Sequence, residues 1–374
     1  MSLYAIVLAA GEGTRMRSQR PKPLHLICGR PMVMHVVHSL EGTQPDRTVV
    51  VIGHGADQVA TRVQNDSPGW AHVTFAHQVV QRGTGDAVTV GLTALDQIFL
   101  AGGNAEHDDT STILVLPGDT PLLSRATIER LVAQHESSGH AATVLVARIP
   151  DPTGYGRVIR AKDGRVLRIV EQRDASEEEQ RVDEVNTSIY AFRRDLLGPA
   201  LRRVTPNNAQ SEYYLTDVVS VLADMGHQVG AMVAEASETQ GVNDRWQLAL
   251  AEREMRARIN RQWLLAGVTM FDPERTCIDV DVQIGRDVTL YPGTLLQGST
   301  IVGSNCEIGP DTRLVDCVVG EHSTVTNTAA RKSTIGSNCV VGPFAHLSAD
   351  SRVTDGQTTG AFYDSSRTLP KNTD

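Results

Sequence analysis

The chain has 374 residues with 44 acidic and 35 basic side chains, so its formal net charge is −9 at pH 7. A chain of this length can form two or three domains with a substantial hydrophobic core. Its acidic balance argues against nonspecific binding to nucleic acid or to an anionic membrane. No apolar run approaches the roughly 20 residues of a membrane span, and no signal segment opens the chain. The five cysteines include no Cys-x-x-Cys pair, which favours reduced structural thiols and a cytoplasmic location.

The first predicted element is a buried strand that ends in a glycine turn. Residues Ala5–Leu8 form an unbroken apolar run, the side chains become small at Ala9 and Ala10, and Gly11 and Gly13 follow. Glycines let the main chain turn sharply, and the N–H groups of such a turn form an anion-binding concavity. Four cations come next: Arg15, Arg17, Arg20 and Lys22. The simplest ligand for this arrangement is a polyphosphate, and a simple turn after a strand is the alternative. The motif matches neither a P-loop nor a dinucleotide fingerprint.

Strand-like and helix-like patterns then alternate up to about residue 150. We expect strands at 48–52, 73–76, 112–116 and 142–147, and helices at 31–40, 56–63, 85–95 and 124–137. This alternation predicts a parallel sheet covered by helices on both faces. Because ligands gather at the carboxyl ends of the strands in such sheets, the opening loop, Gln78–Gly85 and Leu116–Asp119 should meet at one edge.

A second lobe of the same domain is predicted after Pro150. An Asp163-Gly164 turn indicates a hairpin between residues 154 and 170. Further strands are expected at 185–192 and 229–234, with a helix at 213–225. This lobe would close over whatever the opening loop holds.

Two segments at strand ends carry candidate binding groups. Asp119 follows a buried strand, and its carboxylate could hold Mg²⁺, which takes only one or two protein oxygens; a turn aspartate is the alternative. The amide of Gln78 could bind a donor and an acceptor on a pyrimidine edge, helped by main-chain groups at Gly83 and Thr84. A polar loop before a helix is the alternative there.

The last third of the chain repeats every six residues, after a helical stretch at 243–265. The repeating aliphatic residues are Ile284, Leu290, Leu296, Val302, Ile308 and Leu314, and the frame resumes after a slip near 319–334 at Ile335, Val341, Leu347 and Val353. Small residues or cysteine mostly come four positions later, at Val288, Thr294, Thr300, Cys306, Thr312 and Val318. This period is typical of a parallel β-helix.

The motifs together resemble those of bifunctional N-acetylglucosamine-1-phosphate uridylyltransferases/glucosamine-1-phosphate acetyltransferases. The string Leu8–Met16, Ser18 and the run Pro21–His25 carry the resemblance, which extends over roughly residues 3 to 347. It implies a Rossmann-like α/β nucleotidyltransferase domain and a left-handed β-helix that forms homotrimers with acetyl-coenzyme A sites between subunits. It also implies transfer of a uridylyl group from UTP to N-acetylglucosamine-1-phosphate with Mg²⁺.

The resemblance assigns roles to individual residues. Arg15 and Lys22 would stabilise the triphosphate and the developing charge, and Asp119 with Asn243 would hold Mg²⁺; an N-cap is the alternative role of Asn243. The nucleotide would bind at Leu8, Ala9, Ala10, Gly11, Gly13, Gln78, Gly83, Thr84, Pro117 and Gly118. The sugar would bind at Gly156, Glu171 and Asn186. Asp86 departs from the family, where histidine is usual, and places a negative charge beside the nucleotide pocket.

The resemblance ends after Ala345. Ser348-Ala349-Asp350 stands where the family has an Arg-Pro-Gly turn, and the expected basic side chains are missing, so we expect acetyltransferase activity to be lost. The domains expected are 1–240 (nucleotidyltransferase), 241–267 (connector helix), 268–360 (truncated hexapeptide β-helix, its end capped by 360–363) and 361–374 (a polar tail, disordered from residue 365). Another hexose-1-phosphate with UTP or dTTP, or a non-catalytic nucleotide-sugar-binding scaffold, are the alternative functions.

Overall fold

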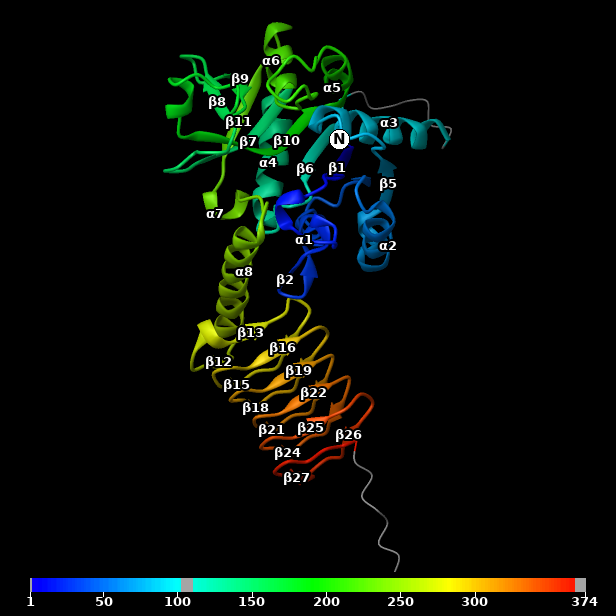
Figure 1. The fold of residues 1–374 in the computed structure, drawn as a ribbon, viewed down its shortest axis with the longest axis vertical. Helices are drawn as coiled ribbons and strands as arrows, with labels where there is room; N and C mark the ends of the chain where they lie inside the picture. Colours follow the sequence, from blue (N-terminus) through cyan, green and yellow to red (C-terminus); the bar gives the residue numbers. More distant parts are fainter. Residues whose placement is uncertain (1, 102–109, 367–374) are drawn as a thin grey trace, which may run out of the picture. The chain divides into compact units, whose positions relative to one another are not determined.

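A computed structural model describes residues 2–101 and 110–366, and these form two compact units. The first unit comprises residues 1–25 and 31–251, and the second comprises residues 26–30 with the chain from Glu252 onward. Helix α8 (Arg245–Leu265) contributes residues to both, so the structure divides the expected connector between the two units. Figure 1 shows the elements of each unit.

The first unit is built on a nine-stranded sheet with the order β11-β7-β10-β6-β1-β4-β5 and an attached β8–β9 hairpin. Its strands are β1 (Leu3–Ala9), β4 (Arg47–Ile52), β5 (Val73–His77), β6 (Thr112–Pro117), β7 (Ala142–Arg148), β8 (Arg157–Arg160), β9 (Val166–Val170), β10 (Glu184–Arg193) and β11 (Val229–Val233). The predicted strands and the hairpin are confirmed, and β1, β4, β5 and β6, all predicted before residue 150, pair in parallel. Strand β10 of the second lobe runs antiparallel to β6 and β7, so the sheet is mixed.

Helices cover both faces of this sheet. On one face α3, α5 and α6 pack against side chains such as Ile6 and Val51, and on the other α1, α2 and α4 pack against Val7 and Val50. Alternate strand residues therefore enter opposite cores, as the two-residue period of a strand requires. The helices are α1 (Met32–Ser39), α2 (Ala56–Asp66), α3 (Thr84–Ala101), α4 (Arg125–Ser138), α5 (Arg194–Leu201), α6 (Asp217–Asp224) and the short α7 (Ala236–Thr239). Ser124 caps α4, accepting a hydrogen bond from Thr127 N.

Helix α6 begins four residues later than the predicted start at Tyr213. Tyr213 N donates to Arg82 O, Gly85 N donates to Tyr213 O, and Leu215 N donates to Thr84 Oγ1. These bonds use backbone groups in a pairing with a distant loop, so the segment cannot form helical bonds at the same time. The apolar pattern of the segment gives no sign of this long-range pairing.

The second unit is a left-handed parallel β-helix, as predicted, with three faces of stacked strands (Figure 1). One face contains β12 (Thr269–Met270), β15 (Thr289–Leu290), β18 (Glu307–Ile308), β21 (Thr324–Val325), β24 (Val340–Val341) and β27 (Thr358–Gly360). The second contains β13 (Cys277–Ile278), β16 (Leu295–Gln297), β19 (Arg313–Val315), β22 (Ala329–Arg331) and β25 (His346–Leu347). The third contains β14 (Gln283–Ile284), β17 (Ile301–Val302), β20 (Val318–Val319), β23 (Thr334–Ile335) and β26 (Arg352–Val353).

The stacked strands continue without a break through the expected slip at 319–334. Buried aliphatic residues follow Leu314 at Val319, Val325, Ala330 and Ile335, at steps of five, six, five and five residues. Three shortened turns therefore replace the interruption inferred from the sequence. One assignment was wrong as a result: Val318 is 44% exposed, and Cys317, with no exposed surface, takes the small inner position.

Short extra segments complete the two units. Strands β2 (Leu26–Ile27) and β3 (Arg30–Pro31) form a two-stranded sheet, and Cys28 O in the turn between them accepts from Val280 N within the second unit. The 3-10 helices are η1 (Thr14–Met16), η2 (Lys22–Leu24), η3 (Gly69–Ala71), η4 (Glu179–Arg181) and η5 (Pro273–Arg275). No helix among the described residues is long and apolar enough to cross a membrane.

The expected tail begins as part of the β-helix. Asp364 forms a parallel bridge with His346, and Ser365 N donates to His346 O. Phe362 N likewise donates to Pro343 O, one coil earlier. Residues 360–366 therefore extend the coil by part of a rung and do not fold over its end, so both the predicted cap at 360–363 and a tail starting at 361 are wrong. The rest of the predicted tail, 367–374, lies outside the described residues.

Candidate active site

The opening loop brings the backbone of β1 close to Lys22. Gly13 has φ +63°, and a Cβ there would lie 2.5 Å from Lys22 Cβ, so only glycine allows this approach. Gly53 packs equally closely against the loop, because a Cβ added to Gly53 would lie 2.7 Å from Ala10 O. Gly11, in contrast, is exposed and has nothing near its Cβ position. The loop is therefore packed on its inner side and open at its tip.

Four predicted residues from three loops converge beside it. Lys22 Nζ contacts Asp119 Oδ2 and donates to Asn243 Oδ1 at 2.9 Å, and Arg15 Nη2 donates to the same Asn243 oxygen at 3.0 Å. Lys22 is largely buried, with 13% of its side chain exposed. The result is a compact cluster of two cations, one carboxylate and one amide at the carboxyl edge of the sheet.

Backbone contacts hold the loops that carry this cluster. Gly118 N donates to Leu8 O at 2.8 Å, and Val242 N donates to Asp119 O at 2.9 Å. Pro117 and Gly118 therefore lie directly beside the end of β1. The alternative role of Asn243 is wrong: Asp244 caps α8 by accepting from Gln247 N at 2.8 Å, which leaves the Asn243 oxygen to the two cations.

The oxygens of Asp119 and Asn243 suit a divalent cation. Both contact Lys22 Nζ, and Asn243 Oδ1 also accepts from Arg15, so the two oxygens lie within reach of one bound cation. Mg²⁺ prefers oxygen ligands and takes only one or two from the protein. Among the described residues no three His, Cys, Asp or Glu side chains gather into a metal-binding group.

The predicted nucleotide loop lies against the opening loop. Gln78 is buried, and its Nε2 donates to Asp86 Oδ2 at 2.8 Å and to Gly83 O at 3.2 Å. Gly83 has φ +111°, and a Cβ there would lie 2.6 Å from Tyr213 O. The hydroxyl of Thr84 accepts from Leu215 N, so this side chain ties the loop to the segment before α6.

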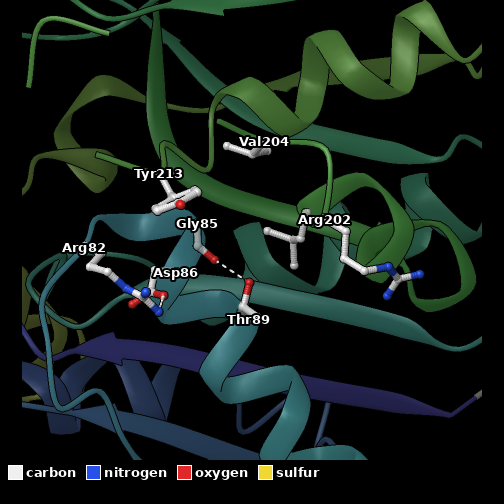
Figure 2. Close-up of a pocket in the computed structure, with 8 residues that line it drawn as sticks. Arg82, Gly85, Asp86, Thr89, Arg202, Val204 and Tyr213 are labelled. Carbon is white, nitrogen blue, oxygen red and sulfur yellow. Dashed lines mark hydrogen bonds and ion pairs between the residues drawn. The ribbon is translucent and has the colours of Figure 1, made fainter. Parts of the chain in front are cut away.

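The negative charge of Asp86 is compensated within the same loop. Arg82 Nη2 lies 2.7 Å from Asp86 Oδ1, and the Arg82 guanidinium lies over the Tyr213 ring. Figure 2 shows Arg82 directed at Asp86 at the start of α3. A cavity of about 210 Å³ borders these side chains and is also lined by Gly85, Thr89, Leu201, Arg202, Val204 and Tyr213.

The three predicted sugar-binding residues lie together in the second lobe. Asn186 N donates to Gly156 O at 2.9 Å, and a Cβ on Gly156 would lie 3.5 Å from both carboxylate oxygens of Glu171. Burial raises the pKa of Glu171 above its usual range, which the hydrogen bond from Thr216 Oγ1 at 3.2 Å partly offsets. Asn186 is buried at a bulge in β10, where its Oδ1 accepts from Ser188 N.

Sequence reasoning missed three side chains at this edge. Thr216 contacts Glu171, and the hydroxyl of Tyr214 is buried. Burial, and secondarily the charge of Asp119, raise the pKa of Tyr155. Tyr155 could have been found from its place next to Gly156, whereas Tyr214 and Thr216 were hidden in the predicted helix.

Tyr155 also borders a second cavity, of about 350 Å³, in the first unit. Its other lining residues come from the ends of β7 and β10 and from α7: Ala147, Ile149, Pro150, Asp151, Val185, Thr187, Ala236, Thr239 and Gln240. The active-site edge therefore has open space on the side of the second lobe.

Comparison with known proteins identifies the family. Residues 5–261 match the MobA-like NTP transferase domain. The chain is 48% identical to the bifunctional protein GlmU of Thermobifida fusca, over 88% of this chain and 66% of that protein. It is 43% identical to the GlmU proteins of Caldanaerobacter subterraneus and Halalkalibacterium halodurans, over 94% and 96% of this chain and 73% and 75% of theirs. The chain thus spans about two thirds to three quarters of these relatives, and it belongs to the bifunctional GlmU family, with an NTP transferase domain as its first unit.

Proposed function

We propose that the chain is a sugar-1-phosphate uridylyltransferase that converts UTP and N-acetylglucosamine-1-phosphate into UDP-N-acetylglucosamine and pyrophosphate. The observation that carries the proposal is the convergence of Arg15, Lys22, Asp119 and Asn243 at the glycine loop. A triphosphate needs several positive groups within a few ångströms, and this edge of the sheet supplies them beside an open backbone turn. Family membership supports the same reaction class.

The reaction needs positioning and charge stabilisation more than proton transfer. An oxygen of the sugar phosphate attacks the α-phosphorus in line, a new P–O bond forms, and the bond to the β-phosphate oxygen breaks with its electron pair leaving on pyrophosphate. The attacking phosphate is already ionised, so no general base is required. Arg15 and Lys22 would neutralise the charge that develops on the phosphate oxygens. Mg²⁺ held by Asp119 and Asn243 would supply further charge neutralisation and would align the phosphates.

Base and sugar selection would come from the two flanking groups of residues. Gln78 and Gly83 would contact a uracil or thymine base, and Gly156, Glu171 and Asn186 would contact the sugar. The sugar assignment depends on fewer groups, so a different hexose-1-phosphate with UTP or dTTP is the second candidate. A non-catalytic scaffold would not need Arg15, Lys22 and Asp119, and the sequence has all three.

A pyrophosphate-release assay across a matrix of nucleoside triphosphates and sugar-1-phosphates, with and without Mg²⁺, tests this proposal. We expect turnover with UTP and N-acetylglucosamine-1-phosphate that requires Mg²⁺. Asp119→Ala should abolish it, whereas Asp163→Ala, which removes an exposed turn carboxylate, should not. Absence of pyrophosphate release with every pair, from a folded protein, would refute the proposal.

For the second unit we propose self-association into a trimer without acetyl transfer. Ile301 and Val318 stack on one outer face of the β-helix and are 40% and 44% exposed, which suits a protein contact. Residues 348–350 offer no guanidinium to hold an amino sugar phosphate. Light scattering should give three times the chain mass, and Ile301→Asp should lower it. Thiol release from acetyl-coenzyme A with glucosamine-1-phosphate should stay at background, and robust turnover would refute the loss.

A further inference from the structure

The amide of Gln78 has both of its hydrogens in use. Nε2 donates to Asp86 Oδ2 and to Gly83 O, and a carboxylate and a carbonyl can only accept. The reverse orientation of the amide would place its oxygen against two other acceptors. The network therefore determines which end of the side chain is nitrogen. Among the described residues the Oε1 atom accepts no hydrogen bond, so it is the group left for a ligand.

Asp86 is itself held in place. Its second oxygen pairs with Arg82 Nη2 at 2.7 Å, and 10% of its side chain is exposed. It lies in the first turn of α3, where the helix dipole favours a negative charge. Arg82 in turn lies over the Tyr213 ring. The carboxylate of Asp86 can only accept a hydrogen bond, so it keeps the Nε2 end of the Gln78 amide facing it.

This arrangement has a consequence for base selection. Uracil and thymine present an N3–H donor at the pyrimidine edge, whereas cytosine presents an unprotonated N3 acceptor. We infer that Asp86, supported by Arg82, is a positioning residue that holds Gln78 as an acceptor and thereby selects uracil or thymine over cytosine. The inference deepens the proposed function and depends on Gln78 contacting the base.

The test compares the ratio of kcat/KM for UTP to that for CTP in the full-length protein. In Asp86→Asn the new amide can donate to Gln78 Oε1. The Gln78 amide can then rotate and present either its oxygen to uracil or its nitrogen to cytosine. Only the longer bond to Gly83 O then opposes the rotation, whereas in the wild type cytosine leaves the buried Oε1 of Gln78 facing another acceptor. We expect the UTP/CTP ratio to fall by roughly tenfold to a hundredfold, because this mismatch with cytosine is relieved. Asp96→Asn is the matched control, because Asp96 is in the same helix and pairs with Arg194. This variant should keep the wild-type ratio.

Two further measurements separate the possible outcomes. Calorimetric titration of the wild-type protein with UTP and CTP shows whether it binds either nucleotide, and binding of neither would overturn the proposed function. If the wild type binds and turns over UTP while Asp86→Asn keeps the wild-type ratio, the inference is overturned and the proposed function stands. Should Asp86→Asn not fold, Arg82→Gln removes an exposed guanidinium and should lower the ratio in the same direction; an unchanged ratio there would overturn the inference.

Discussion

The positive charge of Lys22 is held at one defined position in the candidate active site. Its ammonium lies between Asp119 Oδ2 and Asn243 Oδ1, and Arg15 shares the second of these oxygens. Only one formal negative charge faces two cations, so the cluster has spare positive charge for an anionic ligand. The close approach of Gly13 to the Lys22 side chain restricts where that ammonium can go.

Replacing Lys22 tests this reading directly. Lys22→Ala should lower kcat by roughly 10²- to 10³-fold, the effect of removing one pre-organised charge from a transition state. The free energy of unfolding should change by only about 1 kcal/mol, because the side chain of Asp119 is 25% exposed and can be hydrated once Lys22 is removed. Pyrophosphate release and urea unfolding measure the two effects. Lys162→Ala, in the exposed hairpin turn, should change neither, and full turnover in Lys22→Ala would exclude the role.

Glu171 predicts a dependence of stability on pH. Because burial raises its pKa, the folded chain keeps this proton to a higher pH than the unfolded chain, so the contribution of Glu171 to stability falls as pH rises from about 4.5 through the raised folded value. Glu171→Gln removes this loss and should unfold at a higher temperature than the wild type near neutral pH, with little difference near pH 4. Turnover should meanwhile show a higher KM for the sugar phosphate.

Thermal unfolding of the two proteins between pH 4 and pH 8 gives the comparison. Glu177→Gln, at an exposed position near the end of the same hairpin, is the control and should shift the melting temperature little at any pH. A melting-temperature difference for Glu171→Gln that stayed constant across this range would contradict the assignment.

At the scale of elements, the nucleotide loop depends on a partner segment far along the chain. Residues 82–85 pair with 213–215 through backbone bonds and through the Thr84 hydroxyl. Gly83 makes the pairing possible, since its φ of +111° and its contact with Tyr213 O leave no room for a side chain. The loop that would bind the base is thus joined to the segment that carries Tyr214 and Thr216 beside Glu171.

Gly83→Ala should disrupt both the loop and the fold around it. We expect a loss of about 1–3 kcal/mol in the free energy of unfolding, together with a higher KM for UTP. Gly154→Ala is a matched control, because Gly154 also has a positive φ, of +89°, but has open space around it. Equal losses of stability in the two variants would show that strain at φ, and not the clash with Tyr213, is responsible.

For the whole molecule, the two units have separate hydrophobic cores. The first unit buries its side chains on the two faces of the mixed sheet, and the second buries one apolar residue in nearly every strand of the β-helix. In a stacked coil each rung contacts only its neighbours, so a defect should act locally.

A core substitution in the second unit should therefore leave nucleotidyl transfer intact. Leu314→Ala removes a fully buried side chain and should reduce the unfolding free energy of that unit by about 2–5 kcal/mol. Ile301→Ala, at a half-exposed position of the same β-helix, should cost clearly less. Calorimetry and pyrophosphate release at 25 °C check both statements. A large drop in kcat for Leu314→Ala would show that the units are coupled.

Local pattern was sufficient for most elements of the first unit and failed at identifiable places. The predicted strands are confirmed, because the pattern of apolar residues that indicates a strand is set by residues adjacent in the sequence. The predicted start of α6 was wrong because the backbone of Tyr213, just before the helix, pairs with Arg82 and Gly85, more than 100 residues away. The prediction that Val318 takes a small inner position was wrong, because three turns of the coil are one residue shorter than the others. Only the register of the stacked rungs shows these shorter turns.

The sequence by itself determined the fold class and predicted the kind of ligand. A six-residue aliphatic period is typical of a parallel β-helix, and a glycine turn followed by cations indicates an anion site, because both patterns are local. Only the tertiary structure decided which groups meet: Lys22 contacts Asp119 and Asn243, which are 97 and 221 residues away, and Asp86 takes both Arg82 and the amide nitrogen of Gln78. Hydrogen-bond partners depend on distances between loops, and these follow from strand order and packing, which no single stretch of sequence specifies.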